Sequence, residues 1–96
     1  MTKADIVNRI AQETGMEKMD VQSTVEAFMR SVRDSVESGE NVYLRGFGSF
    51  VVKTRAAKTG RNILAKKSIQ IPAHNIPSFK PAKEFVDNVK SGVAVD

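Results

Sequence analysis

The segment NVYLRGFGSFVVKTR, residues 41–55, decides the fold that the sequence predicts. Residues 42–44 and 49–55 are rich in β-branched and aromatic side chains, and two glycines flank the phenylalanine between these runs. This pattern predicts two strands joined by a turn at residues 46–48. Apolar and polar side chains alternate again from Ile69, and Pro72 favours an edge position or a break in the pairing before residues 76–79 continue as extended chain. We therefore expect an antiparallel meander.

Helices are predicted on both sides of this meander. Thr2 and Asp5 form the pattern of a capping box, and Gly15 is the glycine that commonly ends a helix. A second helix is expected over residues 18–38, and a third over residues 81–92. Segregated helices and an antiparallel sheet indicate the α+β class: a base of two N-terminal helices plus a C-terminal helix, and a three-stranded sheet extended into a long β-ribbon arm.

The charge is strongly polarised along the chain, although the formal net charge is only +4. Between residues 41 and 83 there are nine basic residues and no aspartate or glutamate. Such a one-sign field is costly in self-repulsion and is typical of a protein that binds a polyanion. Nucleic acid is the first candidate and an anionic membrane the second. The nine residues are Arg45, Lys53, Arg55, Lys58, Arg61, Lys66, Lys67, Lys80 and Lys83.

Catalytic and metal-site patterns are weak. The chain has no cysteine, and His74 is its single histidine, which we expect to be structural or solvated. The glycines at 46 and 48 are not followed by the Lys-Ser/Thr of a phosphate loop. We expect no enzymatic activity and no cofactor. The N-terminus lacks an apolar signal region and no run is long enough to span a bilayer, so a cytoplasmic protein is expected.

The residue types in the predicted arm indicate which kind of nucleic acid the protein binds. Readers of single strands and RNA place aromatic rings among their basic residues, but residues 53–67 contain no aromatic side chain. We expect packing to account for the five phenylalanines and the tyrosine elsewhere. Ile63 and Leu64 lie near the turn-forming residues 60–62, and aliphatic wedges beside arginine are used to kink duplex DNA from the minor groove. Double-stranded DNA is therefore favoured.

Three motifs carry a resemblance to a known family: GFGSF at 46–50, RAAKTGRN at 55–62 and IPSFKP at 76–81. They resemble the bacterial histone-like HU proteins and the related integration host factor. The resemblance covers about residues 1–90. It implies an intertwined dimer whose two ribbon arms hold DNA, nucleoid association, DNA bending and compaction with little sequence preference.

The resemblance also implies roles for particular residues. The arm would enter the groove, the body would meet phosphates, and backbone amides near two glycines would approach phosphate closely. Ile63 stands where the family has an intercalating proline, and Lys66 where it has a turn glycine. The implied arm residues are Arg55, Lys58, Arg61 and Asn62; the body residues are Lys3, Lys80 and Lys83; the glycines are Gly46 and Gly48. We add Arg45, Lys53, Lys66 and Lys67 as basic contacts and Ile63 and Leu64 as wedges.

We predict one domain over residues 1–96, with residues 1–52 and 69–96 as the dimerisation body and 53–68 as the DNA-binding arm. Preference for nicked or kinked DNA is expected, because unstacking there is partly complete. Alternatives are a sequence-selective bending factor similar to integration host factor, a general DNA and RNA binder, and a protein that binds anionic membrane or acidic protein surfaces. Membrane binding is disfavoured, because the basic residues lie on strands and loop rather than on an amphipathic helix. The predicted dimer core is Val25, Phe28, Met29, Val32, Leu44, Phe47, Phe50 and Phe79.

Overall fold

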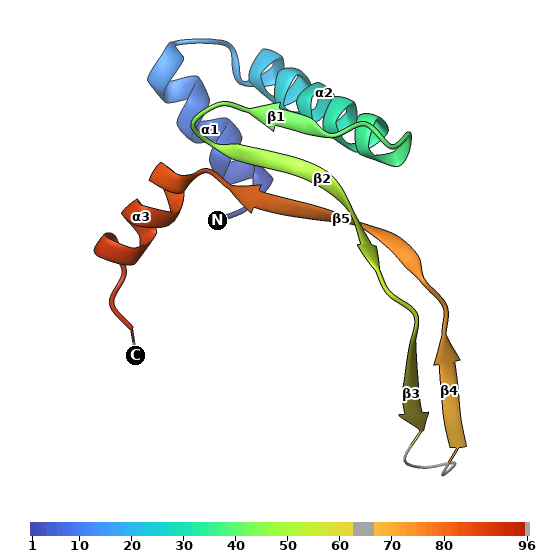
Figure 1. Ribbon diagram of the computed structural model, residues 1–96. Coiled ribbons are helices and arrows are strands. Elements are labelled where there is room, and N and C mark those ends of the chain that lie inside the picture. The colour runs from blue at the N-terminus through green and yellow to red at the C-terminus, as the bar shows by residue number, and fades with distance from the viewer. Residues whose placement is uncertain (63–66, 96) are drawn as a thin grey trace. The chain divides into compact units, whose positions relative to one another are not determined.

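The computed structural model describes residues 1–62 and 67–95, with backbone alone for residues 61, 62, 67 and 68. The chain divides into two compact units, residues 1–35 and 36–96. Within the described residues a pair of helices comes first, the strands follow, and a further helix ends the order of elements; Figure 1 labels each of them. The predicted α+β class is confirmed.

The N-terminal unit contains α1 (Lys3–Thr14) and most of α2 (Lys18–Glu37). The predicted capping box is confirmed, since the Thr2 hydroxyl accepts from the Asp5 amide and the Asp5 carboxylate accepts from the Thr2 amide. Gly15 ends α1 with φ 74°, in the left-handed region that glycine tolerates. The predicted ends of α2 agree with the structure to within one residue.

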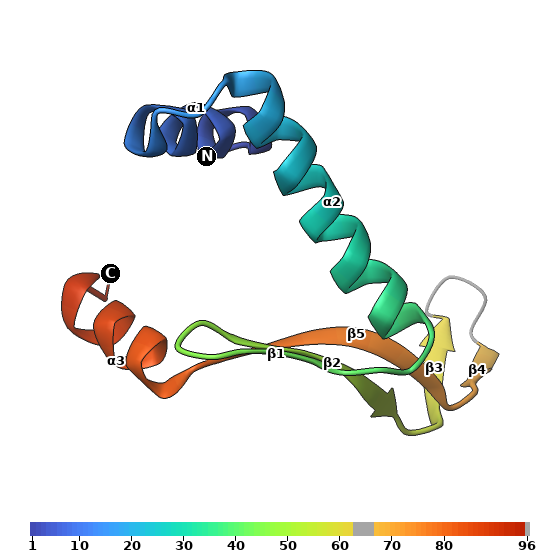
Figure 2. The same cartoon turned by 90° about the horizontal axis from the view of Figure 1, so that it is seen from above.

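The second unit is built on a three-stranded antiparallel sheet in the order β1-β2-β5 (Figure 2). The strands are β1 (Val42–Leu44), β2 (Gly48–Arg55) and β5 (His74–Pro81). Gly48 was expected in the turn, but it is the first residue of β2 and lies opposite both Leu44 and Pro81. The proline at 77 is accommodated because β5 is an edge strand.

Beyond this sheet the chain forms a separate two-stranded ribbon of β3 (Lys58–Asn62) and β4 (Lys67–Ile71). In Figure 1 the ribbon continues away from the ends of β2 and β5. The predicted break at Pro72 is confirmed, because pairing stops at Ile71 and resumes at His74. The predicted ribbon arm is therefore present, and it begins where the sheet ends.

The final helix, α3 (Lys83–Gly92), starts later than the sequence predicted. Pro81 was expected to open this helix, but it is the last residue of β5 and pairs with Gly48. Ala82 occupies the N-cap position without a side-chain hydrogen bond. Its amide instead donates to the carbonyl oxygen of Phe47 at 2.9 Å, which ties the start of the helix to the β1–β2 turn.

Four of the five phenylalanines form one cluster in the second unit, which we call the phenylalanine cluster: Phe47, Phe50, Phe79 and Phe85. The ring of Phe79 lies 4.9 Å from Phe50 and 5.2 Å from Phe47, measured between centroids. Phe47 lies 5.7 Å from Phe85 of α3. Such separations are favourable for aromatic pairs. The prediction that packing also accounts for the tyrosine is wrong, because Tyr43 is 72% exposed.

The isolated chain buries little of its apolar surface. Among the described residues, Val7 of α1 and Val21 of α2 are the hydrophobic side chains that are fully buried. The side chains of the predicted dimer core differ in exposure in the isolated chain. The partly buried ones are Val25, Val32, Leu44 and Phe50, and the exposed ones are Phe28, Met29, Phe47 and Phe79. A chain of this size is marginal even with a complete core, and here large apolar side chains are left exposed.

Candidate nucleic-acid interface

The two faces of the three-stranded sheet differ in chemistry. Side chains alternate between faces along a strand, and residues that are paired across strands share a face. The register pairs Phe50 with Phe79, which puts both on one face. The opposite face, which we call the basic face, carries the polar or charged side chains Tyr43, Ser49, Lys53, Arg55, His74 and Lys80, together with the half-buried Val51, Ile76 and Ser78. One face of the sheet is therefore suited to packing and the other to binding an anion.

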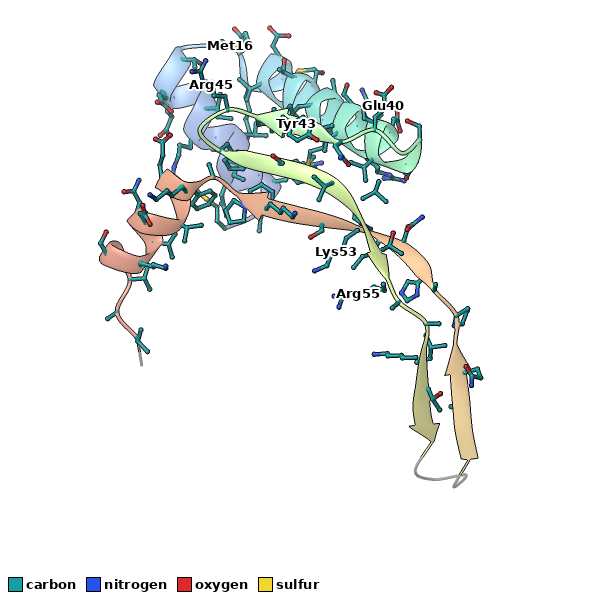
Figure 3. All side chains as sticks on the ribbon, viewed as in Figure 1. Met16, Glu40, Tyr43, Arg45, Lys53 and Arg55 are labelled. Carbon is teal, nitrogen blue, oxygen red and sulfur yellow. The ribbon has the colours of Figure 1, made fainter. Side chains whose placement is uncertain are left out.

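Lys53 and Arg55 lie at the end of β2 on the basic face, where the sheet passes into the ribbon. They lie two residues apart on β2 and therefore point to the same side, as Figure 3 shows. Lys53 is paired with Ile76 and Arg55 with His74. Both cations are exposed, and the sequence places no carboxylate between Asn41 and Lys83. Their positive charges can therefore bind an anionic ligand, because residues 41–83 supply no carboxylate to pair with them.

Other predicted contacts lie along the same unit. Arg45 is exposed in the β1–β2 turn, and Lys58 is exposed at the start of β3. Lys80 is exposed on β5 opposite Ser49, and Lys83 is exposed at the first position of α3. The structure thus distributes exposed cations from the turn through the sheet to the ribbon.

The ribbon's outer part is described by its backbone. Pairing puts Arg61 opposite Ser68 and Asn62 opposite Lys67. The predicted wedges Ile63 and Leu64 and the predicted contact Lys66 lie outside the described residues. Their roles remain predictions from the sequence.

The two glycines of the GFG motif have different surroundings. Gly46 is exposed, has φ 80°, and a Cβ built on it would meet nothing within 4 Å. Gly48 is buried, and a Cβ there would lie 2.5 Å from the carbonyl oxygen of Lys80 and 2.7 Å from the ring of Phe79. Gly46 is needed for its left-handed backbone and Gly48 for close packing of β2 on β5.

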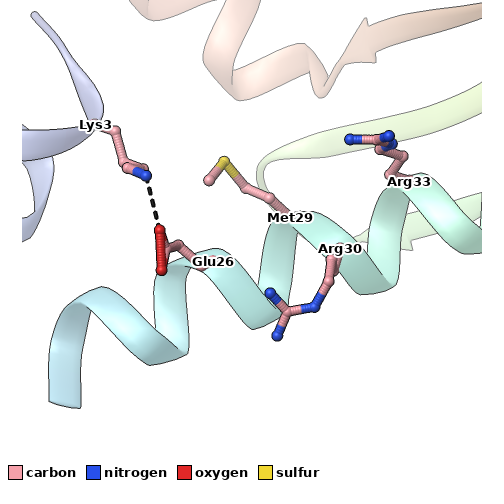
Figure 4. A pocket seen from close by; sticks show the side chains of 5 residues that line it. All are labelled: Lys3, Glu26, Met29, Arg30 and Arg33. Atoms are coloured by element: carbon pink, nitrogen blue, oxygen red, sulfur yellow. Dashed lines mark hydrogen bonds and ion pairs between the residues drawn. The ribbon is translucent and has the colours of Figure 1, made fainter. Parts of the chain in front are cut away.

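Lys3 lies in the N-terminal unit, where it lines a shallow groove with Glu26, Met29, Arg30 and Arg33 (Figure 4). Its Nζ donates to Glu26 Oε2 at 2.8 Å, joining the first turn of α1 to the middle of α2. This hydrogen bond and the lysine charge hold the pKa of Glu26 below its ordinary value. A phosphate approaching Lys3 would compete with this carboxylate.

Metal sites and membrane-spanning helices are both absent from the part of the chain that the structure describes. Within residues 1–62 and 67–95, no group of three or more His, Cys, Asp or Glu side chains is placed to hold a metal ion. Over the same ranges, none of the helices combines the length and the apolar character that crossing a membrane requires.

Two residues on the basic face were not predicted as binding residues. His74 was expected to be structural or solvated, and it is exposed, directly opposite Arg55. Tyr43 was expected to pack, yet its exposed ring lies opposite Ser49, and its hydroxyl accepts from the Asn41 side-chain amide at 3.3 Å. Counting strand register outward from the β1–β2 turn would have placed Tyr43 on this face. The position of His74 depends on the pairing of β2 with β5, which is distant in the sequence.

Comparison with known proteins identifies the family of this chain. The model of a family described as bacterial DNA-binding protein matches residues 1–90. The chain belongs to this family. Similar members are the DNA-binding protein HU of Thermus thermophilus, 44% identical over 90 residues that cover 94% of this chain and 93% of that protein, and HU of Geobacillus stearothermophilus, 39% identical over 94% of this chain and all of that protein.

Solved structures of HU proteins share the fold. An Anabaena HU–DNA cocrystal structure aligns with a TM-score of 0.87 and 32% identity, covering 93% of this chain and 97% of that one. HU from Thermotoga maritima aligns with a TM-score of 0.65 and 25% identity, covering 93% of this chain and 98% of that one. The helices, sheet and ribbon described above are therefore those of the HU family.

Proposed function

We propose that this HU-family chain is a non-enzymatic architectural protein that binds duplex DNA through the minor groove, bends it and compacts the nucleoid. The observation that carries the proposal is the basic face, with its exposed cations and the absence of any carboxylate between Asn41 and Lys83. Lysine and arginine that neutralise phosphates supply most of the sequence-independent affinity for DNA. The bound DNA in the Anabaena HU structure supports the same ligand.

The proposed active form is a homodimer. The isolated chain leaves large apolar side chains uncovered on both units, including Phe28 at 47% and Phe47 at 45% exposure. Burying one such side chain stabilises by about 1.5–3 kcal/mol, so several of them outweigh the entropy lost on association. A second copy offers a matching apolar surface. Sedimentation equilibrium at micromolar concentration should give twice the chain mass of 10.5 kDa, and a clean monomer would contradict the proposal.

The composition of the arm favours duplex DNA as the ligand over single-stranded DNA and RNA. Its predicted tip has aliphatic rather than aromatic residues, and aliphatic side chains act as wedges between stacked base pairs. Nicked or kinked duplexes should bind more tightly, because part of the unstacking cost, about a few kcal/mol per step, is already met. Location on the bacterial chromosome follows from the same activity.

A gel-shift panel tests the function. Linear, nicked, kinked and single-stranded DNA and duplex RNA are compared at one salt concentration, with the Arg55→Ala plus Lys58→Ala variant beside the parent. Arg9→Ala, which removes an exposed cation of α1 outside the basic segment, is the matched control. The parent and the control should bind nicked and kinked duplexes most tightly, and the arm variant should be weaker on all duplexes.

Two outcomes would overturn the proposal. Equal binding of single strands and duplexes would contradict recognition of the double helix. Co-sedimentation with anionic liposomes at physiological salt, without any duplex shift, would favour the membrane alternative instead.

A further inference from the structure

His74 lies where the three-stranded sheet passes into the ribbon. It is the first residue of β5, and the register places it directly opposite Arg55, the last residue of β2. Directly paired residues have Cβ atoms about 4.5–5.5 Å apart on the same face. Lys53 and its partner Ile76 form the next pair on that face. An imidazole and two permanent cations therefore share one exposed surface.

The hydrogen bond of the ring determines which nitrogen can take up a proton. His74 Nδ1 lies 3.1 Å from the carbonyl oxygen of Pro72. A carbonyl oxygen only accepts, so Nδ1 carries a hydrogen and donates it. In the neutral ring Nε2 is then the unprotonated nitrogen. Protonation at Nε2 converts an acceptor into a second donor and adds a positive charge to the exposed side chain.

The segment around His74 carries cations, and the sequence has no aspartate or glutamate between Asn41 and Lys83. Lys53 and Arg55 face it from β2, and Lys58, opposite Ile71, is the charged residue at the start of the ribbon. On the other face, the Thr54 hydroxyl donates to Asn75 Oδ1 at 2.7 Å, so these two neutral side chains are hydrogen-bonded to each other. A phosphate placed between these groups would favour the protonated, positively charged form of the imidazole. Proton uptake should therefore accompany phosphate binding.

We propose that Lys53, Arg55 and His74 form one phosphate-binding site at the start of the arm, which His74 completes by taking up a proton from solvent as DNA binds. The site rests on the proposed function, because its phosphate comes from the DNA backbone. Histidine is the side chain that commonly changes charge between mildly acidic and mildly alkaline pH, and only the charged imidazole adds a cation for the phosphate. DNA affinity should then rise as the pH falls.

The test is fluorescence anisotropy of a short labelled duplex at about pH 6 and about pH 8, at constant ionic strength. The parent should bind more tightly at the lower pH by about three-fold for each arm that contacts DNA, or roughly ten-fold for a dimer. His74→Gln should bind with nearly the same affinity at both pH values. His74→Lys, which carries a permanent charge, should bind tightly at both.

A matched control moves the imidazole to the other face of the same strand. Asn75→His in the His74→Gln background keeps one histidine in the chain, but opposite Thr54 rather than Arg55. This variant should show little of the parent's pH response. Circular dichroism and melting temperature confirm that each variant is folded.

The outcomes separate this site from the proposed function. A parent that binds duplex DNA equally at both pH values would overturn the His74 site and leave the DNA-binding function intact. An equal pH response in His74→Gln would also overturn it, because the response would then come from another group such as the Met1 amine. Failure of the parent and every variant to bind duplex DNA at either pH would instead overturn the proposed function.

Discussion

The three-stranded sheet and the two-stranded ribbon are continuous in the chain, but different interactions hold them. The sheet carries the phenylalanine cluster on one face, with ring centroids 4.9–6.3 Å apart. The described residues of the ribbon include no aromatic side chain, and its strands are held by backbone pairing from Lys58 to Asn62. Aromatic packing therefore holds the sheet and backbone pairing holds the ribbon, whereas the exposed cations lie on the basic face of the sheet and at the start of the ribbon. Substitutions should separate stability from DNA affinity.

The largest expected effect is a loss of stability on substitution in the phenylalanine cluster. Phe79→Ala removes the ring that contacts Phe47, Phe50 and Phe85. Truncating a buried phenylalanine costs about 3–5 kcal/mol, and the cost approaches this range if a second copy covers the cluster. Thermal unfolding should show a large fall in melting temperature, and sedimentation should show weaker dimerisation. Tyr43→Ala is the matched control, since it removes an exposed ring from the other face of the same sheet. Equal destabilisation by both changes would contradict the distinction between the faces.

A smaller effect is expected at Gly48. Gly48→Ala forces a Cβ to within 2.5 Å of the Lys80 carbonyl oxygen and 2.7 Å of the Phe79 ring. Overpacking of this kind costs about 1–3 kcal/mol. Gly46→Ala meets no atom within 4 Å and is disfavoured through its φ of 80° alone, at about 1–2 kcal/mol. Urea unfolding should rank Gly48→Ala as the less stable of the two, and the reverse order would contradict the packing role.

Local signals in the sequence predicted much of this structure. The Thr2–Asp5 capping box, the left-handed Gly15 and the break at Pro72 each depend on a few neighbouring residues, so the sequence alone is sufficient for them. The hydrogen bond between Lys3 and Glu26 spans 23 positions, and no local pattern indicates it. The His74–Arg55 pairing likewise depends on the register of two strands that are distant in sequence.

The arm tip gives a prediction that concerns DNA rather than stability. Ile63 and Leu64, which lie outside the described residues, are predicted to insert between base pairs and kink the duplex. The double variant Ile63→Ala with Leu64→Ala should bend DNA less, as measured by energy transfer across a short labelled duplex, with the melting temperature unchanged. A bend as sharp as the parent's would rule out the wedge role. Ile63→Pro should sharpen the bend, because proline fixes φ and removes the amide hydrogen.

The smallest expected effect is at the start of α1. Hydrogen bonds from the Thr2 amide and hydroxyl hold the pKa of Asp5 below its ordinary value of 3.8. The stabilisation is therefore present above that value and disappears as the pH falls through the lowered pKa. Asp5→Asn should lower the melting temperature slightly near neutral pH, and the difference from the parent should shrink in strong acid. A difference that stays constant with pH would contradict the capping role of the carboxylate.

The salt dependence of duplex binding tests the central claim, that the arm's cations bind DNA phosphates, most directly. If a dimer neutralises on the order of eight phosphates, log K should fall against log salt with a slope of about −7. Arg55→Ala should make the slope shallower by roughly one unit for the arginine–phosphate pair that it removes from each arm, without changing stability. An affinity that hardly changes with salt, or a slope that Arg55→Ala leaves unaltered, would contradict the claim.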